Sequence, residues 1–451
     1  MWTFKEAEAY LADTAPPGKS IYGLGRINHL LDLLEHPENS FPCITVVGTN
    51  GKGSTIAFLD ALLGSHGVKT ACHIKPHLES VTERIRLDGT DSTKEQFATA
   101  LWKVKQAVDE GWSRDDRPTY FELIFTAFLV AAKTEDAEIA LLEAGLGGRL
   151  DAVNSVDAPL VVMTSVDLDH TDLLGDSLRL IALEKLAVVR KDATLVCQMN
   201  DPEVMDAVRE KAESVGFRLV EMKDANLLKP VDDGSFRYQS KSAGTIENII
   251  LSLKGPFQRL NASLALFAFE TLVEDVLPTD LKIQLSEGAI LNGLASARIP
   301  GRWEMIDDGK TCIKWILDGG HNPAAMKEIL RQFREKEYGF RSIIFGMKRG
   351  KDIEMVIPDL VRSTDRLVFV NVPDLDCYSP NELAEYVSAE LDKSPGFSQI
   401  QIDTGDSISE AVRMLSESND SIDTALVTGS LYLVGAARSI LNRRKPIPRA
   451  E

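Results

Sequence analysis

The 451-residue sequence lacks any uninterrupted apolar run of 18 residues, and it is short of cysteine and of positive charge. A membrane-spanning helix needs about 20 mainly apolar residues in succession, so no membrane span is predicted. The first fifteen residues, MWTFKEAEAYLADTA, mix charged with apolar side chains and do not resemble a signal peptide. The expectation is a cytoplasmic protein, although an organellar leader removed before this numbering stays open.

Only five cysteines occur, and none belongs to a C-x-x-C pair. Disulfide frameworks use an even number of cysteines and zinc ribbons use close pairs, so neither is predicted. These residues are therefore interpreted as buried or incidental thiols in a reducing compartment: Cys43, Cys72, Cys197, Cys312 and Cys377.

Positive charge is scarce because 50 Lys and Arg residues stand against 68 Asp and Glu residues, which gives a net charge of −18. Such a field repels a polynucleotide, so no nucleic-acid partner is predicted. A small anionic substrate remains compatible, because nearby cationic groups and helix N-termini set the field inside a cleft. The 44% hydrophobic and 26% charged residues are typical of a folded globular protein.

Apolar runs alternate with helical patterns, which predicts an α/β fold with a mainly parallel sheet. Runs rich in β-branched residues at 43–48, 138–144 and 159–166 predict central strands that are covered on both faces. Apolar residues at helical spacing predict helices over 92–109, with Thr93 as its cap, and over 120–133.

The α/β alternation is interrupted twice. Residues 223–255 are rich in turn-forming residues around short alternating stretches, which predicts an antiparallel hairpin at the surface. Pro300 and Gly301 then break the pattern before the alternation restarts. We therefore predict two domains, residues 1–298 and 299–451.

The strongest single motif is GTNGKGS, which follows an apolar strand and precedes a helical pattern. Glycines allow backbone N–H groups to surround phosphate oxygens, Lys52 adds a positive charge, and Ser54 offers a hydroxyl to magnesium. A glycine-rich turn without a ligand is the alternative, but such a turn has no need of the lysine. The predicted phosphate-binding residues are Gly48, Thr49, Asn50, Gly51, Lys52, Gly53 and Ser54.

Further motifs follow GTNGKGS in a fixed order. They are EAGLGGRLDAVN (143–154), DLDHTDLLG (167–175), EK (184–185), PGRWE (300–304), LDGGHNP (317–323) and GSLYLVG (429–435). With SIYGLGRINHLL and PHLESVTERIRLDG, they make essentially the whole chain resemble the folylpolyglutamate synthase and dihydrofolate synthase family, a branch of the Mur ligase superfamily. The resemblance implies a P-loop ATPase domain followed by a smaller Rossmann-like domain, with the active site between them.

The resemblance also implies a reaction. In this family a substrate carboxylate attacks the γ-phosphate of ATP, and the amine of L-glutamate displaces the resulting acyl phosphate. The implied partners are ATP, Mg²⁺, L-glutamate and a folate or dihydropteroate acceptor, and a monomer is expected. No motif distinguishes the two synthase activities from each other.

The resemblance assigns three residues to metal binding and catalysis, in addition to the Ser54 hydroxyl that the GTNGKGS loop offers. Glu143 matches a ligand of one magnesium ion, His170 matches a ligand of a second, and Lys185 matches a lysine that carries a carbamate. Taken alone, such residues would be ordinary surface charges, a hydrogen-bonded histidine and a snorkelling lysine. A partly buried lysine with a lowered pKa is what carbamylation requires.

The resemblance also implies the remaining nucleotide contacts. Asp318 and His321 belong to LDGGHNP and Arg302 belongs to PGRWE, all in the second predicted domain, whereas Asn261 lies in LNASLAL of the first. A turn with Asp and Gly after a strand is also common for purely structural reasons.

Three positions depart from the family pattern. Lys75 stands where a serine normally completes the first magnesium shell, and Leu186 follows Lys185 where the family has Ala-Gly. The segment 347–354 retains Lys351 and Asp352 but lacks a leading acid. For Lys75 two interpretations are open: the ammonium points away and water completes the metal shell, or its charge acts on the γ-phosphate.

Three other functions compete with the glutamate ligase. A related Mur-type ligase would join a different amino acid to a different acid. A nucleotide switch or motor would share GTNGKGS but has no use for the second domain. A non-catalytic folate-binding module would follow if Lys75 had abolished metal binding.

Overall fold

The computed structural model describes residues 2–14, 23–224, 227–232, 234–277, 283–336, 339–373, 376–393, 399–418 and 422–444. Residues 20–22 of the SIYGLGRINHLL motif and Asp233 of the predicted hairpin lie outside the described residues. The chain forms two compact units. The first contains Met1–Ser252 and Gln258–Arg298, and the second contains Leu253–Phe257 and Ile299–Glu451.

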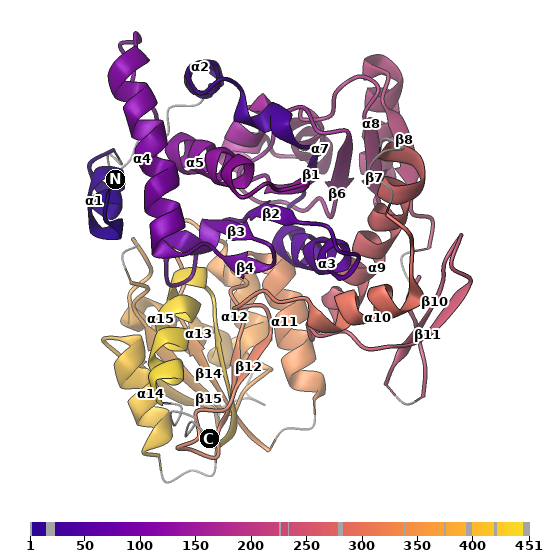
Figure 1. Ribbon diagram of the computed structural model, residues 1–451. Helices are drawn as coiled ribbons and strands as arrows, with labels where there is room; N and C mark the ends of the chain where they lie inside the picture. The colour runs from indigo at the N-terminus through magenta and orange to yellow at the C-terminus, as the bar shows by residue number, and fades with distance from the viewer. Residues whose placement is uncertain are drawn as a thin grey trace, which may run out of the picture. The chain divides into compact units, whose positions relative to one another are not determined.

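The first unit is built on a sheet with the described strand order β4-β3-β2-β5-β1-β6-β7-β8 (Figure 1). Neighbours from β2 to β8 run parallel, whereas β3 and β4 extend the edge in antiparallel pairing. Every residue of β1, β5 and β6 is buried, which confirms the three predicted central strands. The strands are β1 (Cys43–Val47), β2 (Thr70–His73), β3 (Ile85–Leu87), β4 (Thr90–Asp91), β5 (Ile139–Glu143), β6 (Leu160–Met163), β7 (Thr194–Cys197) and β8 (Arg218–Glu221).

Helices cover both faces of this sheet. The α4 and α5 pair packs with α7 and α8 in one apolar cluster on one face, and α3 lies across the other face (Figure 1). Thr93 caps α4, as predicted, and Thr119 caps α5, each in a capping box. The helices are α1 (Phe4–Thr14), α2 (Gly25–Leu33), α3 (Lys52–Ser65), α4 (Lys94–Gly111), α5 (Tyr120–Thr134), α6 (Thr171–Leu174), α7 (Leu178–Leu186), α8 (Pro202–Val215), α9 (Pro256–Thr271) and α10 (Glu287–Ser296).

The predicted surface hairpin is present as a small antiparallel sheet. It contains β9 (Lys229–Pro230), β10 (Phe236–Gln239) and β11 (Thr245–Ile249). The hydroxyls of Tyr238 and Ser240 both donate to the buried carboxylate of Glu270 on α9. This pair of hydrogen bonds attaches the hairpin to the helix that follows it in the chain.

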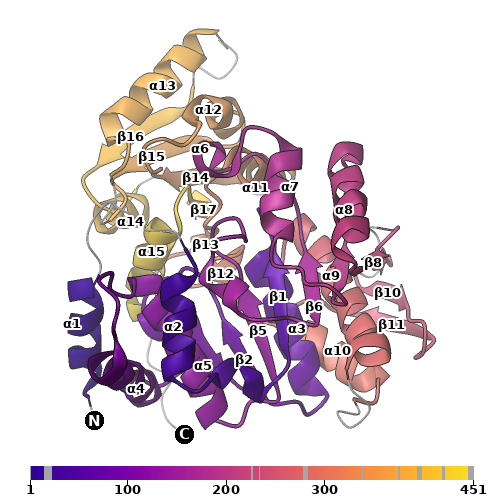
Figure 2. The ribbon, with the colours of Figure 1, turned by 90° about the horizontal axis from the view of Figure 1, so that it is seen from above.

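The second unit restarts the α/β alternation as the sequence predicts. Its described strands have the order β12-β13-β17-β14-β15-β16, all parallel except β12 (Figure 2). The strands are β12 (Glu304–Ile306), β13 (Lys314–Leu317), β14 (Phe340–Phe345), β15 (Arg366–Val370), β16 (Gln401–Gly405) and β17 (Ile422–Thr428). The helices are α11 (Pro323–Glu335), α12 (Ile353–Val361), α13 (Pro380–Lys393), α14 (Ile408–Ser416) and α15 (Leu431–Arg444).

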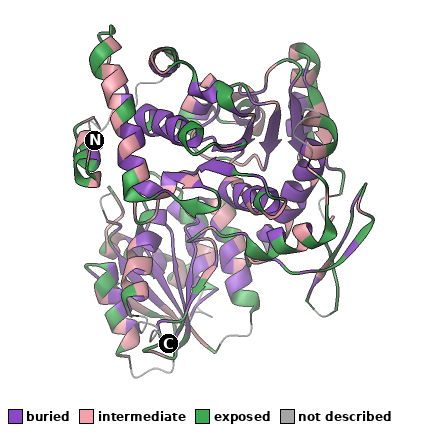
Figure 3. Ribbon diagram, in the orientation of Figure 1, coloured by how far each residue is buried: buried purple, intermediate pink, exposed green. Residues whose placement is uncertain are grey.

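In each unit the central strands are buried, and most of the covering helices are exposed on one side (Figure 3), whereas α5 is buried from Glu122 to Ala132. The helices are also limited in length and hydropathy. Among the described residues, no helix is long and apolar enough to cross a membrane.

Candidate active site

The 48–54 loop joins the end of β1 to the start of α3, and its glycines are required by close approaches. Gly51 has φ +86° and precedes the first residue of α3, Lys52. A Cβ at Gly51 would lie 2.5 Å from Oδ1 of Asn261, and one at Gly48 would lie 2.0 Å from Oγ1 of Thr164. The loop therefore holds its N–H groups at a helix N-terminus, where an anion is favoured.

A second loop, after β6, fixes the first one in place. The Thr49 amide donates to the Ser165 carbonyl at 2.8 Å, and the Asn50 amide donates to the Ser165 hydroxyl at 3.0 Å. The Asn50 side chain donates to the carboxylate of Asp167 at 3.2 Å. Ser165 and Asp167 were not among the predicted site residues, because this role depends on contacts between distant parts of the chain.

Two lysines converge on the 48–54 loop. The Lys52 ammonium donates to the carbonyls of Gly48 and Thr49, both at 3.0 Å, and the Lys185 ammonium donates to the Gly48 carbonyl at 3.1 Å. Lys185 is only 3% exposed, and burial, with a smaller contribution from the charge of Lys52, lowers its pKa from 10.5 to about 7. The structure thus brings these two predicted residues together.

Glu143 is the last residue of β5 and lies in register with Val46 of β1, close to the start of the 48–54 loop. Its side chain is buried, and its Oε2 accepts a hydrogen bond from the Lys75 amide at 2.9 Å. The end of a parallel strand therefore supplies a carboxylate beside the loop, as the sequence predicts.

Lys75 forms an ion pair that no motif of the sequence predicts. Its ammonium donates to Oδ1 of Asp151 at 3.1 Å, and both side chains are largely buried. Asp151 also accepts hydrogen bonds from the amides of Gly145, Leu146 and Val153. Lys75 is therefore part of the ion pair that holds the glycine-rich turn after Glu143.

We expect charge reversal at Lys75 to destabilise the protein. In Lys75→Glu, two carboxylates would meet, and a like-charge contact at 4 Å costs on the order of 4 kcal/mol at an effective dielectric of about 20. Lys75→Ser should cost less, because Asp151 keeps its three backbone donors. Urea unfolding of wild type and both variants measures this order, and the double variant Lys75→Glu/Asp151→Lys should regain part of the loss. Equal unfolding free energies for all forms would contradict a role for the pair.

The other two predicted magnesium ligands, Ser54 and His170, differ in burial. Ser54, in the first turn of α3, is buried, whereas His170 is exposed, has φ +51° and lies immediately before α6. Within the described part of the chain, no three His, Cys, Asp or Glu side chains form a ready-made metal cluster. A buried hydroxyl and a buried carboxylate nevertheless suit magnesium, which is usually held by one or two protein oxygens with phosphates and water.

The second unit gathers its predicted residues at the end of β13. Asp318 is buried and accepts hydrogen bonds from the amides of Trp303 and Gly320, at 2.9 and 3.0 Å. Burial raises its pKa to about 6, against the opposing charge of Arg302. His321 Nδ1 lies 3.0 Å from the Gly319 carbonyl, and Asn322 caps α11. Asp318, Arg302 and His321 therefore belong to one turn region.

An aromatic group that was absent from the predicted site lies at the start of α5. Phe121 is 55% exposed, and the buried Arg84 guanidinium lies 5.6 Å from its ring centroid and 5.5 Å from that of Tyr120. Arg84 also donates to Nδ1 of His77, two residues after Lys75. The sequence does not show that Phe121 is exposed, so nothing distinguishes it there from a buried phenylalanine of the same helix.

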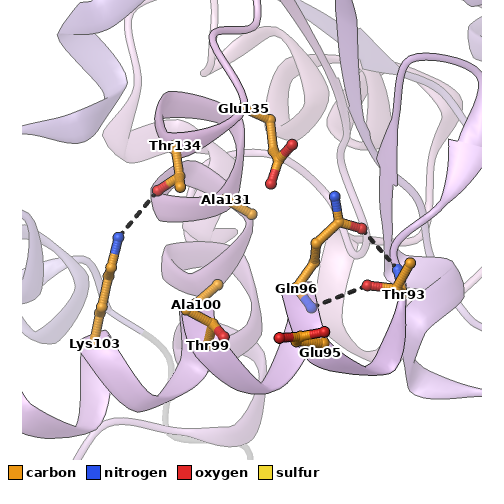
Figure 4. A pocket seen from close by; sticks show the side chains of 9 residues that line it. All are labelled: Thr93, Glu95, Gln96, Thr99, Ala100, Lys103, Ala131, Thr134 and Glu135. Carbon is orange, nitrogen blue, oxygen red and sulfur yellow. Dashed lines mark hydrogen bonds between the residues drawn. The ribbon is translucent and has the colours of Figure 1, made fainter. Parts of the chain in front are cut away.

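A hollow of about 340 Å³ lies between α4 and α5, but it contains none of the predicted site residues (Figure 4). Four of its polar residues are bonded within the protein: Thr93 and Gln96 form the cap of α4, and Lys103 donates to Thr134 at 3.2 Å. This hollow is a feature of helix packing.

Comparison with known proteins agrees with the fold. The Mur ligase middle domain family matches residues 46–269, and the dihydrofolate synthetase C-terminal domain family matches residues 303–440. Together they define an ATP-dependent ligase of the Mur type. The dihydrofolate synthase/folylpolyglutamate synthase of Haemophilus influenzae is 31% identical, over 91% of this chain and 92% of its own. The chain belongs to the dihydrofolate synthase/folylpolyglutamate synthase family.

Solved structures show the same likeness. Escherichia coli FolC in complex with DHPP and ADP is 27% identical, with a TM-score of 0.82 and 98% of both chains covered. The bifunctional folylpolyglutamate synthase/dihydrofolate synthase of Yersinia pestis, complexed with AMPPNP and Mn ion, is 26% identical. Its TM-score is 0.80, and 98% of both chains is covered.

Proposed function

We propose that the protein joins L-glutamate to the carboxylate of dihydropteroate or of a folate, with ATP as the energy source. The observation that carries this proposal is the convergence of Lys52 and Lys185 on the Gly48 carbonyl, beside the buried carboxylate of Glu143. Cations and a metal-binding carboxylate at a helix N-terminus are what phosphoryl transfer to an acid requires.

The reaction divides into two balanced steps. A carboxylate oxygen of the acid substrate attacks the γ-phosphorus of ATP, and ADP leaves, which forms an acyl phosphate. The amine of glutamate then attacks the acyl carbon, phosphate leaves, and the amine loses a proton. Lys52 and the N–H groups of the 48–54 loop offset the negative charge that gathers during the first step.

Magnesium would neutralise phosphate charge when it is bound. Ser54 and Glu143 are our proposed ligands for the first ion, and His170 and a carbamate on Lys185 for the second. Asn261 from the first unit, with Arg302, Asp318 and His321 from the second, are proposed to contact ATP. We further propose that residues 1–298 and 299–451 act as the two domains of a cytoplasmic monomer.

The aromatic group at α5 supports a flat heterocyclic substrate. The exposed Phe121 ring offers a stacking surface, and Arg84 and His77 connect it through direct contacts to the segment that begins at Lys75. Lys75 in turn contacts Glu143 through its amide. A ring system stacked on Phe121 would thus be connected, through Arg84, His77 and the segment from Lys75, to the proposed metal-binding carboxylate of Glu143.

We expect Lys185 to form a carbamate more readily at pH 8 than at pH 6. Only the neutral amine reacts with carbon dioxide: an N–C bond forms and a proton leaves. Because the pKa of Lys185 is about 7, the neutral fraction grows as the pH rises through that value, whereas an ordinary lysine stays protonated. Carbon-13 NMR of the magnesium-loaded enzyme in labelled bicarbonate measures the adduct. Lys185→Arg is the control, and a signal that persists in it would contradict the assignment.

A substrate screen tests the proposed function. Purified protein is incubated with ATP, magnesium, L-glutamate and either dihydropteroate, dihydrofolate or tetrahydrofolate, and products are identified by mass. A gain of one glutamyl unit on at least one pterin acid is expected. If the protein joins only an amino acid other than glutamate, or only an acid without a pterin, it is the related Mur-type ligase and the substrate assignment is wrong.

A further inference from the structure

A buried glutamine connects the predicted metal-binding serine with the predicted nucleotide-binding asparagine. Gln258 lies in the first turn of α9 and is completely buried, although its side chain ends in a polar amide. Its Nε2 donates to the Ser54 hydroxyl at 3.1 Å, and its Oε1 accepts from the Asn261 side chain at 3.1 Å. Gln258 and Ser54 are 204 residues apart in the sequence.

The two contacts are consistent with each other in the orientation that the structure gives the glutamine amide. With an Asn261 N–H group directed at Oε1, reversing the Gln258 amide alone would place two donors against each other. The amide nitrogen of Gln258 therefore faces Ser54, and the serine hydroxyl acts as the acceptor. Asn261 is itself held against the glycine loop, because Gly51 has no side chain at that point.

A hydroxyl group has one hydrogen and two lone pairs. With one lone pair of Ser54 occupied by Gln258, the second lone pair and the hydrogen are directed elsewhere. A metal ion needs a lone pair, and a phosphate oxygen needs a donated hydrogen. The donor from Gln258 thus restricts the rotation of the Ser54 hydroxyl and leaves one lone pair for a metal ion.

We infer that Gln258 is a positioning residue, which orients Ser54 for the magnesium ion that accompanies the nucleotide. This inference rests on the proposed function, in which Ser54 is a metal ligand. It adds a residue outside all the sequence motifs, and it predicts that Gln258 affects nucleotide binding only when magnesium is present.

The test compares the affinity for AMPPNP with and without magnesium. In Gln258→Met the side chain keeps its length but cannot donate to Ser54. We expect the affinity for AMPPNP in EDTA to stay within two-fold of wild type. The magnesium-dependent tightening, which is the ratio of the affinity with magnesium to the affinity in EDTA, should fall about five-fold, as for one hydrogen bond of ordinary net strength. Calorimetric titration gives both affinities. Gln258→Leu serves as a second variant if the methionine form does not fold.

A double-mutant cycle with Ser54→Ala separates positioning from general packing. If Gln258 acts through Ser54, Gln258→Met should have no further effect on the magnesium-dependent tightening once Ser54 is alanine. An equal loss in EDTA and in magnesium, or an additive loss in the Ser54→Ala background, would overturn the inference. If wild type itself does not bind AMPPNP, the proposed function fails instead.

The chain offers a matched control for the substitution. Gln332 on α11 is also a buried glutamine, 6% exposed, and belongs to the second unit. Gln332→Met makes the same chemical change at a position that contacts neither Ser54 nor Asn261 in the described hydrogen bonds. Its magnesium-dependent tightening should equal that of wild type, whatever happens to its thermal stability.

Discussion

Lys52→Ala is expected to lower kcat by about 10²-fold or more, with little change in the fold. The Lys52 ammonium lies over the 48–54 loop, where two carbonyl contacts hold it. Its charge is needed most when negative charge moves between phosphate and acyl oxygens, so its loss raises the barrier more than it weakens substrate binding. Steady-state kinetics at saturating ATP and magnesium measure the loss.

The same variant has a second readout. Lys52 contributes to the lowered pKa of Lys185, so its removal should move the pKa of Lys185 upward, toward the value of a free lysine. Carbamate formation on Lys185 should then require a higher pH than in wild type. Unchanged turnover in Lys52→Ala would contradict the assignment of the loop, and an unchanged pH dependence would contradict the proximity of the two charges.

Glu143→Gln is expected to reduce turnover by about 10²-fold or more as well, but for a different reason. The glutamine keeps the shape of the side chain and can still accept the hydrogen bond from the Lys75 amide. It removes only the negative charge that a magnesium ion requires of a buried ligand. Raising the magnesium concentration should therefore restore part of the activity.

The matched control for Glu143→Gln is Glu122→Gln. Glu122 is also buried, but it is paired with Arg26 at 3.0 Å and caps α5. Its replacement should lower thermal stability without changing the magnesium requirement. If Glu143→Gln keeps wild-type turnover at limiting magnesium, Glu143 is not a metal ligand.

The local features of the fold could be predicted because local sequence determines them. Uninterrupted apolar runs predicted β1, β5 and β6, and a threonine followed three residues later by glutamine gives the capping box at Thr93. The sequence predicts that the glycines of the 48–54 loop allow N–H groups to surround a phosphate, and this stays a prediction. The structure shows a further reason for glycine, because a Cβ at Gly48 or Gly51 would meet the side chain of Thr164 or Asn261.

Pairings between distant residues could not be predicted in this way. The partner of Lys75 is Asp151, 76 residues further along, and only the packing of the turn after β5 brings the two together. The division of the chain is similar: residues 253–257 cluster with the second unit, although the composition changes near residue 298. Such contacts depend on tertiary structure, which no local pattern reports.

The most direct test of the central claim follows an oxygen atom. The acid substrate is prepared with oxygen-18 in its carboxylate and incubated with the enzyme, ATP, magnesium and L-glutamate. If the carboxylate attacks the γ-phosphorus, one labelled oxygen must appear in the inorganic phosphate, which mass spectrometry detects. We expect one oxygen-18 per phosphate released, and release only when both the acid and glutamate are present. Label in AMP, or unlabelled phosphate released without either substrate, would contradict an acyl-phosphate ligase.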